Sequence, residues 1–313
     1  MRRILLLLTF VCLLFVRCAR EVIIDLPEEP AKLVAVCHFT EGQNFRVKIS
    51  LSKPVNDVSE PDFLQSMVGE IEPTLSVNGQ FWDRLKPDTT DTDEITYWES
   101  NRFQLAESEV EYSFSLRISG YPPILSSSKI PKRVELDPIV LGSGDITVVQ
   151  LSDGMSELRV PLELRLKEVP EGAHYFAFNL THETQVHPDP LDPESYTEES
   201  RTNFLADGRT FSLLHDIPEP VVLINENYWA DDRRTLYLVA RIPFDPITER
   251  PSIIFVEWRT LSEQFYRYHL SLSRQGSNLP FSDPDAVFNN TEGGYGNFSG
   301  YAVSLDTVLI PNF

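Results

Sequence analysis

Apolar and polar residues alternate in short runs along most of the chain, and this pattern predicts β-strands. The clearest run spans 158–167, where leucine or valine occupies every second position and polar residues or Pro161 stand between them. A two-residue period places one face of a strand against a core and the other in solvent. Pro161 has no N–H to donate, which predicts an edge strand or a bulge there. The chain has 23 prolines against 14 glycines, which leaves few windows for long helices and favours a mainly β fold.

Two β-sandwich-like domains are predicted from the grouping of these runs. Residues 31–134 contain short strands separated by turns, including an Asn78-Gly79 pair between alternating flanks that is typical of a type I′ hairpin. This spacing favours an immunoglobulin- or fibronectin-like sandwich, although the cysteine and tryptophan pattern of true immunoglobulin domains is missing. After a connecting segment, residues 140–313 predict a larger antiparallel sheet domain.

One segment near the C-terminus departs from the two-residue period and predicts a helix. Thr260 and Glu263 have the TxxE spacing of a capping box, and the apolar side chains that follow share one face. Gly276 then supplies a stop signal. We therefore predict a helix over about residues 261–275 that covers one side or end of the second sheet.

The first eighteen residues have the anatomy of an export signal. Two arginines precede an apolar core at 4–16, which is shorter than the roughly 20 residues that a spanning helix needs. A cysteine directly after such a core indicates a bacterial lipoprotein signal, so we expect residues 1–17 to be removed, Cys18 to carry the lipid and residues 18–30 to form a tether. Arg17 stands where the peptidase normally meets a small residue, so simple secretion and an uncleaved anchor stay open as alternatives.

The charge balance is strongly acidic and excludes one class of partner. The chain has 27 basic and 47 acidic residues, a net charge of −20, and such a surface repels nucleic acid. Outside the leader and Cys18, only Cys37 remains, so no disulfide is expected.

No catalytic constellation emerges from the sequence. A serine nucleophile elbow of the GxSxG type is missing, and His182 and His187 are five residues apart rather than the four of a zinc protease helix. We predict no catalytic residue and no cofactor. The acidic loop after His187 supplies oxygen ligands that calcium accepts, and a solvated loop is the alternative reading. Its candidate calcium ligands are Asp189, Asp192 and Glu194.

Four glycines are crowded into residues 293–300, ahead of an apolar terminal strand. Their spacing is GxGxxxG rather than the GxGxxG of a dinucleotide loop, and no helix follows whose N-terminus would face a phosphate. We read them as backbone freedom for a sharp turn into the last strand. Tyr295 and Phe298 in this stretch either pack the turn or contact a partner, which makes them candidate binding residues.

Both ends of the chain resemble the domain of unknown function 4249 family. The opening at 18–39 is similar to the start of that family, and the closing region at 256–304 carries its aromatic helix and its glycine-rich element. The matching positions are Tyr266 to Tyr268, Asn278 to Phe281, Asn290, Gly293, Gly294, Gly296, Phe298 and Tyr301. The resemblance covers nearly the whole mature chain.

The resemblance implies a lipoprotein of the Gram-negative outer membrane, commonly encoded beside TonB-dependent receptors and without established enzymatic activity. We therefore expect a non-enzymatic accessory or binding component, held by its lipid on the periplasmic or cell-surface face, with such a receptor as partner and no assigned ligand. Two alternatives stay open. One is an extracellular glycan- or peptide-acting hydrolase that uses carboxylates of the acidic loops, and the other is an adhesin-like structural module.

Overall fold

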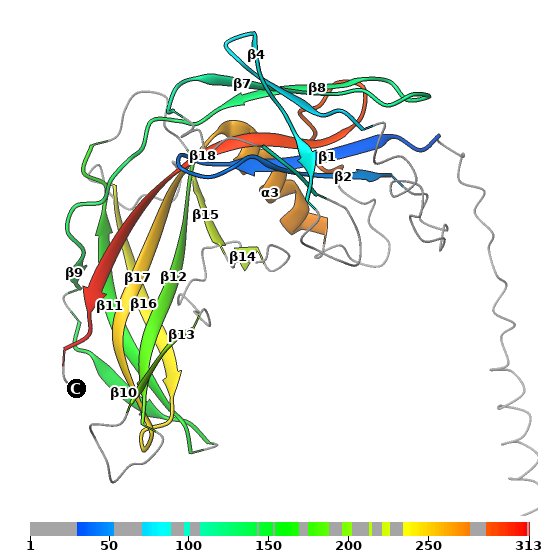
Figure 1. Ribbon diagram of the computed structural model, residues 1–313. Helices are drawn as coiled ribbons and strands as arrows, with labels where there is room; N and C mark the ends of the chain where they lie inside the picture. Colours follow the sequence, from blue (N-terminus) through cyan, green and yellow to red (C-terminus); the bar gives the residue numbers. More distant parts are fainter. Residues whose placement is uncertain are drawn as a thin grey trace, which may run out of the picture.

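The computed structural model describes most of the chain and shows two β-rich limbs that meet at an angle (Figure 1). No helix in the described part is long and apolar enough to cross a membrane. The strands and the helix at Glu263–Gln275 confirm the predicted mainly β, sandwich-like fold with a helix near the C-terminus. The described residues are 30–52, 71–88, 97–100, 107–142, 144–152, 154–168, 175–187, 196–201, 213–214, 221–225, 234–275, 286–311 and 313.

The upper limb of Figure 1 consists of two sheets packed around a first core. One layer contains β1 (Leu33–Phe39), β2 (Arg46–Leu51), β6 (Tyr97–Glu99) and β5 (Lys86–Pro87). The other contains β4 (Gln80–Arg84), β3 (Thr74–Val77), β7 (Glu111–Leu116) and β8 (Ile124–Lys129). Asn78 and Gly79 have φ of 49° and 79° between β3 and β4, as the hairpin prediction requires.

The lower limb has its own core around Trp258, which is fully buried. Its first layer contains β9 (Val140–Leu141), β10 (Thr147–Gln150), β11 (Ser156–Arg165) and β16 (Thr235–Phe244). Its second layer contains β12 (Tyr175–Val186), β13 (Thr197–Arg201), β14 (Leu213–Leu214), β15 (Val221–Asn225) and β17 (Glu249–Leu261).

The position of Pro161 differs from the sequence prediction. It lies in β11, which pairs with β16 on one side and with β10 and β9 on the other, so β11 is an interior strand. β10 ends its pairing at Arg159 and β9 begins at Leu162, and Pro161 falls between the two partners. The missing N–H thus coincides with a change of neighbour rather than with a sheet edge.

A single long strand, β18 (Tyr295–Leu309), joins the two limbs. Residues 295–300 run parallel to β1, and residues 301–309 run antiparallel to β17. Phe298 and Ala302 belong to the first core, whereas Val308 belongs to the second. One ten-stranded sheet therefore extends through both limbs, and the division of the chain into 31–134 and 140–313 stays a prediction.

The helix α3 (Glu263–Gln275) begins directly after β17 and lies beneath the upper limb (Figure 1). Its N-cap is Ser262, whose Oγ accepts a hydrogen bond from the N–H of Phe265 at 3.3 Å. Thr260, the predicted cap, lies in β17 and accepts a hydrogen bond from the N–H of Val134 at 3.0 Å. The helix therefore begins at Glu263 rather than at 261, and it buries Phe265 and Tyr266 in a third cluster.

Candidate binding site at the junction of the two limbs

The candidate site residues from the sequence fall into two groups. Cys18, Asp189, Asp192 and Glu194 lie outside the described residues. Tyr295 lies at the start of β18 with 38 % of its surface exposed, and its hydroxyl oxygen accepts a hydrogen bond from Lys32 Nζ at 2.8 Å. Phe298 is 1 % exposed and stacks on Phe114 in the first core. The two aromatic side chains thus point to different environments, and only Tyr295 is available to a partner.

The glycine-rich element has a structural explanation. The side-chain amide of Asn290 takes the place of a neighbouring strand, because Phe298 donates its N–H to Asn290 Oδ1 at 3.0 Å and Asn290 Nδ2 donates to the Phe298 carbonyl at 2.8 Å. A Cβ atom at Gly296, whose φ is +135°, would lie 1.8 Å from the carbonyl oxygen of Ala35. The element therefore allows β18 to enter close beside β1.

The junction of the limbs is held by hydrogen bonds between segments that are distant in sequence. Ser262 donates its N–H to the Gly300 carbonyl at 3.2 Å, and Gly300 donates its N–H to Ser128 Oγ at 3.3 Å. Together with the hydrogen bond from Val134 to Thr260, these contacts join β8, the segment that follows it, β17 and β18 at the junction. Residues of these same segments line two hollows.

The first hollow, the polar cleft, has a volume of about 750 Å³ and lies between the β7–β8 layer and the start of α3. Three glutamates reach it from separate elements: Glu109 before β7, Glu111 in β7 and Glu263 in α3. Glu109 has a φ of 65°, a region that non-glycine residues rarely occupy. The remaining lining residues are Asn78, Ser127, Ser128, Lys129, Pro131, Tyr175, Leu261, Ser262 and Gln264.

The chemistry of the polar cleft is that of hydrogen bonding. Carboxylates, side-chain amides and hydroxyls outnumber apolar groups in its lining, and Lys129 supplies one cation. Such a set accepts hydrogen bonds from hydroxyl or amine groups of a ligand. Sequence reasoning did not find this cleft, because Glu111 and Glu263 lie 152 positions apart and no local motif links them.

A pair of histidines is buried beneath α3, next to the junction. The ring centroids of His38 in β1 and His269 in α3 are 4.6 Å apart, and Phe265 packs against both rings. Burial lowers the pKa of His38 to about 4; a hydrogen bond with Asn297 opposes this and the charge of Arg259 adds to it. Burial is also the main reason that the pKa of His269 lies well below its usual value, and electrostatic interactions with His38 and Arg259 lower it further. Both rings are therefore neutral near pH 7.

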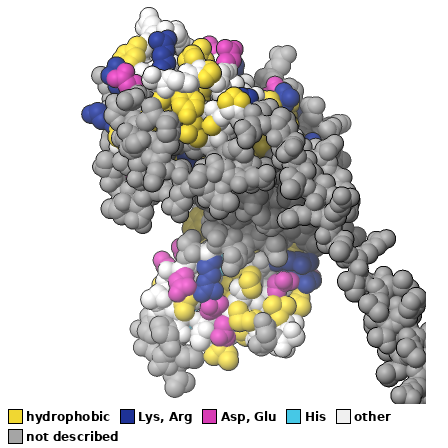
Figure 2. Space-filling view, turned by 90° about the vertical axis from the view of Figure 1, so that its right-hand side faces the viewer, with side chains coloured by type: hydrophobic (Ala, Val, Ile, Leu, Met, Phe, Trp, Pro, Cys, Tyr) yellow, Lys and Arg dark blue, Asp and Glu magenta, His cyan; other side chains and the backbone are white. Residues whose placement is uncertain are grey.

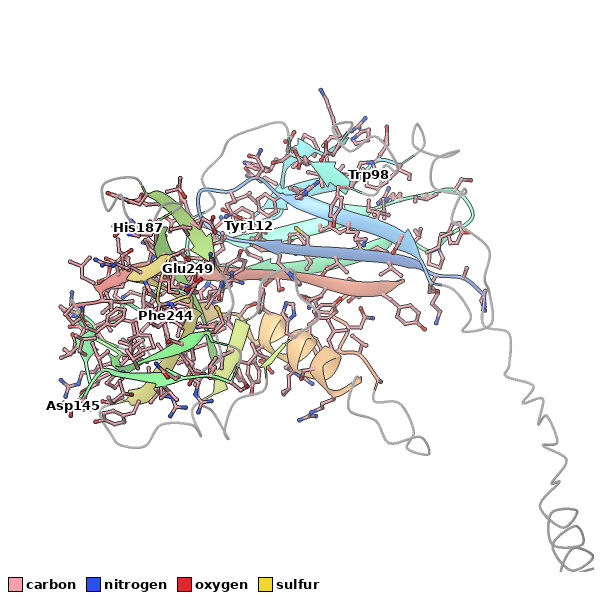
Figure 3. The ribbon with its side chains drawn as sticks, turned by 90° about the horizontal axis from the view of Figure 1, so that it is seen from below. Trp98, Tyr112, Asp145, His187, Phe244 and Glu249 are labelled. Atoms are coloured by element: carbon pink, nitrogen blue, oxygen red, sulfur yellow. The ribbon has the colours of Figure 1, made fainter. Side chains whose placement is uncertain are left out.

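The histidines of the THETQVHP stretch lie in the lower limb, where Figure 3 shows His187 and Glu249. His182 is 1 % exposed, and this burial is the main reason that its pKa is lowered to about 4. The charge of Arg201 lowers the pKa of His182 further, whereas the charge of Glu249 raises it. Arg201 itself forms an ion pair with Glu249 at 2.7 Å. Across the described ranges, no three histidine, cysteine or acidic side chains come together as metal ligands.

Comparison with known proteins adds one finding. The model of the family described as "Domain of unknown function (DUF4249)" matches residues 19–306. No curated protein matches the chain.

Proposed function

Because the chain belongs to the domain of unknown function 4249 family, we propose that it is a non-enzymatic lipoprotein of the outer membrane that serves as an accessory or binding component of a TonB-dependent receptor. The observation that carries this proposal is the leader at residues 1–17, which Cys18 follows directly. Eleven residues, 19–29, separate Cys18 from Pro30, the first described residue. A lipid on Cys18 would hold Pro30 within about 40 Å of the bilayer, the fully extended reach of such a tether.

The register of β1 and β18 defines which end of the molecule the tether would hold. Val34 lies beside Tyr295 in the parallel pair, so the tether and the exposed Tyr295 share one end of the upper limb. Lys32 lies over the Tyr295 ring at 4.6 Å from its centroid. An anchored molecule would present this end to the membrane plane, where an outer-membrane receptor also lies.

The composition of the described surface is compatible with a protein partner. Figure 2 shows one face on which acidic, basic and hydrophobic side chains of the described residues are intermixed. Among the described residues of that face, charges of both signs are interspersed rather than gathered by sign. Non-obligate protein interfaces as a whole are about as apolar as the rest of a protein surface.

The anchor and the partner are tested together by variants of the two cysteines. We expect Cys18→Ser to move the protein from the membrane fraction to the soluble fraction and to abolish recovery of a receptor from detergent-solubilised membranes. Cys37→Ala is the matched control, because the Cys37 thiol is buried in the first core and its pKa is raised by burial to about 12. An unmodified Cys18 in mass spectrometry, or recovery without any envelope partner, would contradict the proposal.

A second candidate function is hydrolysis of glycans or peptides in the polar cleft. The observation in its favour is the approach of Glu111 and Glu263 to one hollow, since glycoside hydrolysis needs two carboxylates that face each other. Turnover of glycan or peptide substrates that is lost in Glu111→Gln/Glu263→Gln would establish this activity. Retention of receptor binding by the same double variant would separate it from the accessory role.

A further inference from the structure

The first half of β18 has β1 as a neighbour, and the second half does not. β1 ends at Phe39, which pairs with Gly300. Beyond that point, residues 301–309 continue along β17, and no described strand pairs with their opposite edge. Figure 1 shows this red half of β18 running down the left-hand side of the lower limb. We call this edge, from Val303 to Leu309, the open edge.

The direction of the backbone groups identifies which of them face the open edge. The carbonyl of Gly300 accepts a hydrogen bond from the N–H of Ser262, and the N–H of Ile310 donates to the carbonyl of Ser252. Even-numbered residues of this stretch therefore direct their N–H and C=O groups toward β17. Alternate residues in a strand point these groups to opposite sides. Val303, Leu305 and Thr307 therefore direct N–H and C=O groups outward. The N–H of Thr307 donates at 2.7 Å to the carboxylate of its own neighbour Asp306, which is a local contact that a strand can replace.

A groove lies along the open edge at the place where β1 stops. It has a volume of about 710 Å³, and Thr40, Glu41, Arg133, Glu135, Val303 and Leu305 are among its lining residues. Beside it, Leu305 and Leu309 are each 73 % exposed. Leu309 lies opposite Ile253 in the ladder, which extends the apolar surface onto β17. The open edge and its groove thus combine outward-facing backbone groups with an apolar strip, the two features that an added strand uses.

We propose that the open edge binds an extended segment of a partner polypeptide as an additional β-strand, in line with β1. This site goes beyond the proposed function, because it requires neither the lipid anchor nor a receptor. The added strand would fill the ladder position that β1 occupies beside the first half of β18. Apolar side chains at alternate positions of that segment would pack on Leu305 and Leu309.

The charge of the groove favours a basic segment over a second copy of this chain. Antiparallel pairing of two copies about Asp306 would bring like charges across the ladder, and each copy carries a net charge of −20. Two arginines, Arg133 and Arg259, already form ion pairs with Glu41 and Glu257. Glu135 is paired with Lys167 at 3.5 Å, so the excess negative charge along the open edge and its groove comes from Asp306, and the net charge of −20 acts in the same direction.

The test is selection of random twelve-residue peptides on the purified full chain, followed by binding measurements with the selected peptide. Thr307→Pro removes an N–H that faces outward, and an edge strand tolerates proline there, so pairing with β17 is retained. Thr307→Val keeps the N–H and is the matched control. We expect basic peptides with alternating apolar residues, and binding at least about tenfold weaker to Thr307→Pro than to Thr307→Val, because a ladder hydrogen bond is lost and the ring obstructs pairing.

Two further measurements keep the result independent of the folding of the proline variant. Hydrogen exchange on the wild-type chain should show new protection at Val303, Leu305 and Thr307 when the selected peptide binds. The same peptide N-methylated at alternate residues should lose binding in the register that blocks the ladder. Failure to select any peptide, equal binding to Thr307→Pro, protection elsewhere, or self-association of the chain through this edge would overturn the proposal.

Discussion

His38 and His269 illustrate how much at the residue scale depends on partners that are remote in sequence. His38 stands in the apolar run LVAVCHF, where it reads as one more strand residue. In the structure it meets His269, and no described residue donates to or accepts from His38 Nε2 or either ring nitrogen of His269. Sequence alone could not pair them, because 230 positions lie between the two.

The histidine pair predicts a loss of stability in mild acid. The folded-state pKa of His38, about 4, lies below its ordinary value of 6.5, and that of His269 is lowered in the same direction. The unfolded chain therefore binds more protons once the pH falls below 6.5, and the free energy of unfolding decreases between pH 6.5 and about 4, by up to about 3 kcal/mol for His38. Urea unfolding at pH 7.5 and 4.5 measures this loss.

The matched variant for that experiment is His38→Gln/His269→Gln, which removes both ionisable rings. We expect it to lose part of the acid dependence that the wild-type chain shows between the two pH values. The remainder comes from other groups, including His182, whose pKa is also lowered to about 4. An unchanged difference between pH 7.5 and 4.5 in the double variant would show that the pair does not titrate in this way.

At the scale of elements, the alternation of apolar residues identified strands well and their partners poorly. β11 and the hairpin at Asn78 follow directly from local pattern and turn chemistry. The parallel pairing of β1 with β18 does not, because strand period reports which face is buried and not which strand lies alongside. Pro161 was misread for the same reason, since the change from β10 to β9 is a tertiary feature.

The entry of β18 beside β1 predicts that one glycine is far more sensitive than another. Gly296→Ala should lower the free energy of unfolding by at least about 3 kcal/mol, because its Cβ would meet the Ala35 carbonyl and its φ of +135° is strained for alanine. Gly154→Ala is the control, with a φ of +86° and no atom within 4 Å of its Cβ. It should cost only about 1 kcal/mol from backbone strain. Equal losses in denaturant titrations of the two variants would count against close approach as the cause.

At the scale of the whole molecule, two cores share one strand. The predicted sandwiches and the late helix could be inferred from sequence, yet the polar cleft and the open edge could not. Both arise where segments meet that the chain order separates, such as Thr40 with Val303 in the groove beside the open edge. A local sequence pattern does not indicate which distant segments come into contact.

The shared strand predicts that both limbs lose their structure in one transition. Trp98 lies in the first core and Trp258 in the second, so single-tryptophan variants report each limb separately by fluorescence. Phe298→Ala should destabilise the first core by about 3–5 kcal/mol. We expect the transitions reported by Trp98 and Trp258 to coincide and to shift together in this variant. A Trp258 transition that does not move would mean that the limbs unfold independently.

The pairing of β1 with β18 also bears on how the chain is made. Val34 pairs with Tyr295, which lies 261 positions later, so the first sandwich is complete only after β18 has been synthesised and has paired with β1. Folding that depends on such distant contacts is slow. While its last segment is still being synthesised, the polypeptide would therefore lack a finished upper limb and stay compatible with threading through an export channel. Under the proposed export, the strand that completes the structure would also delay its closure until passage is over.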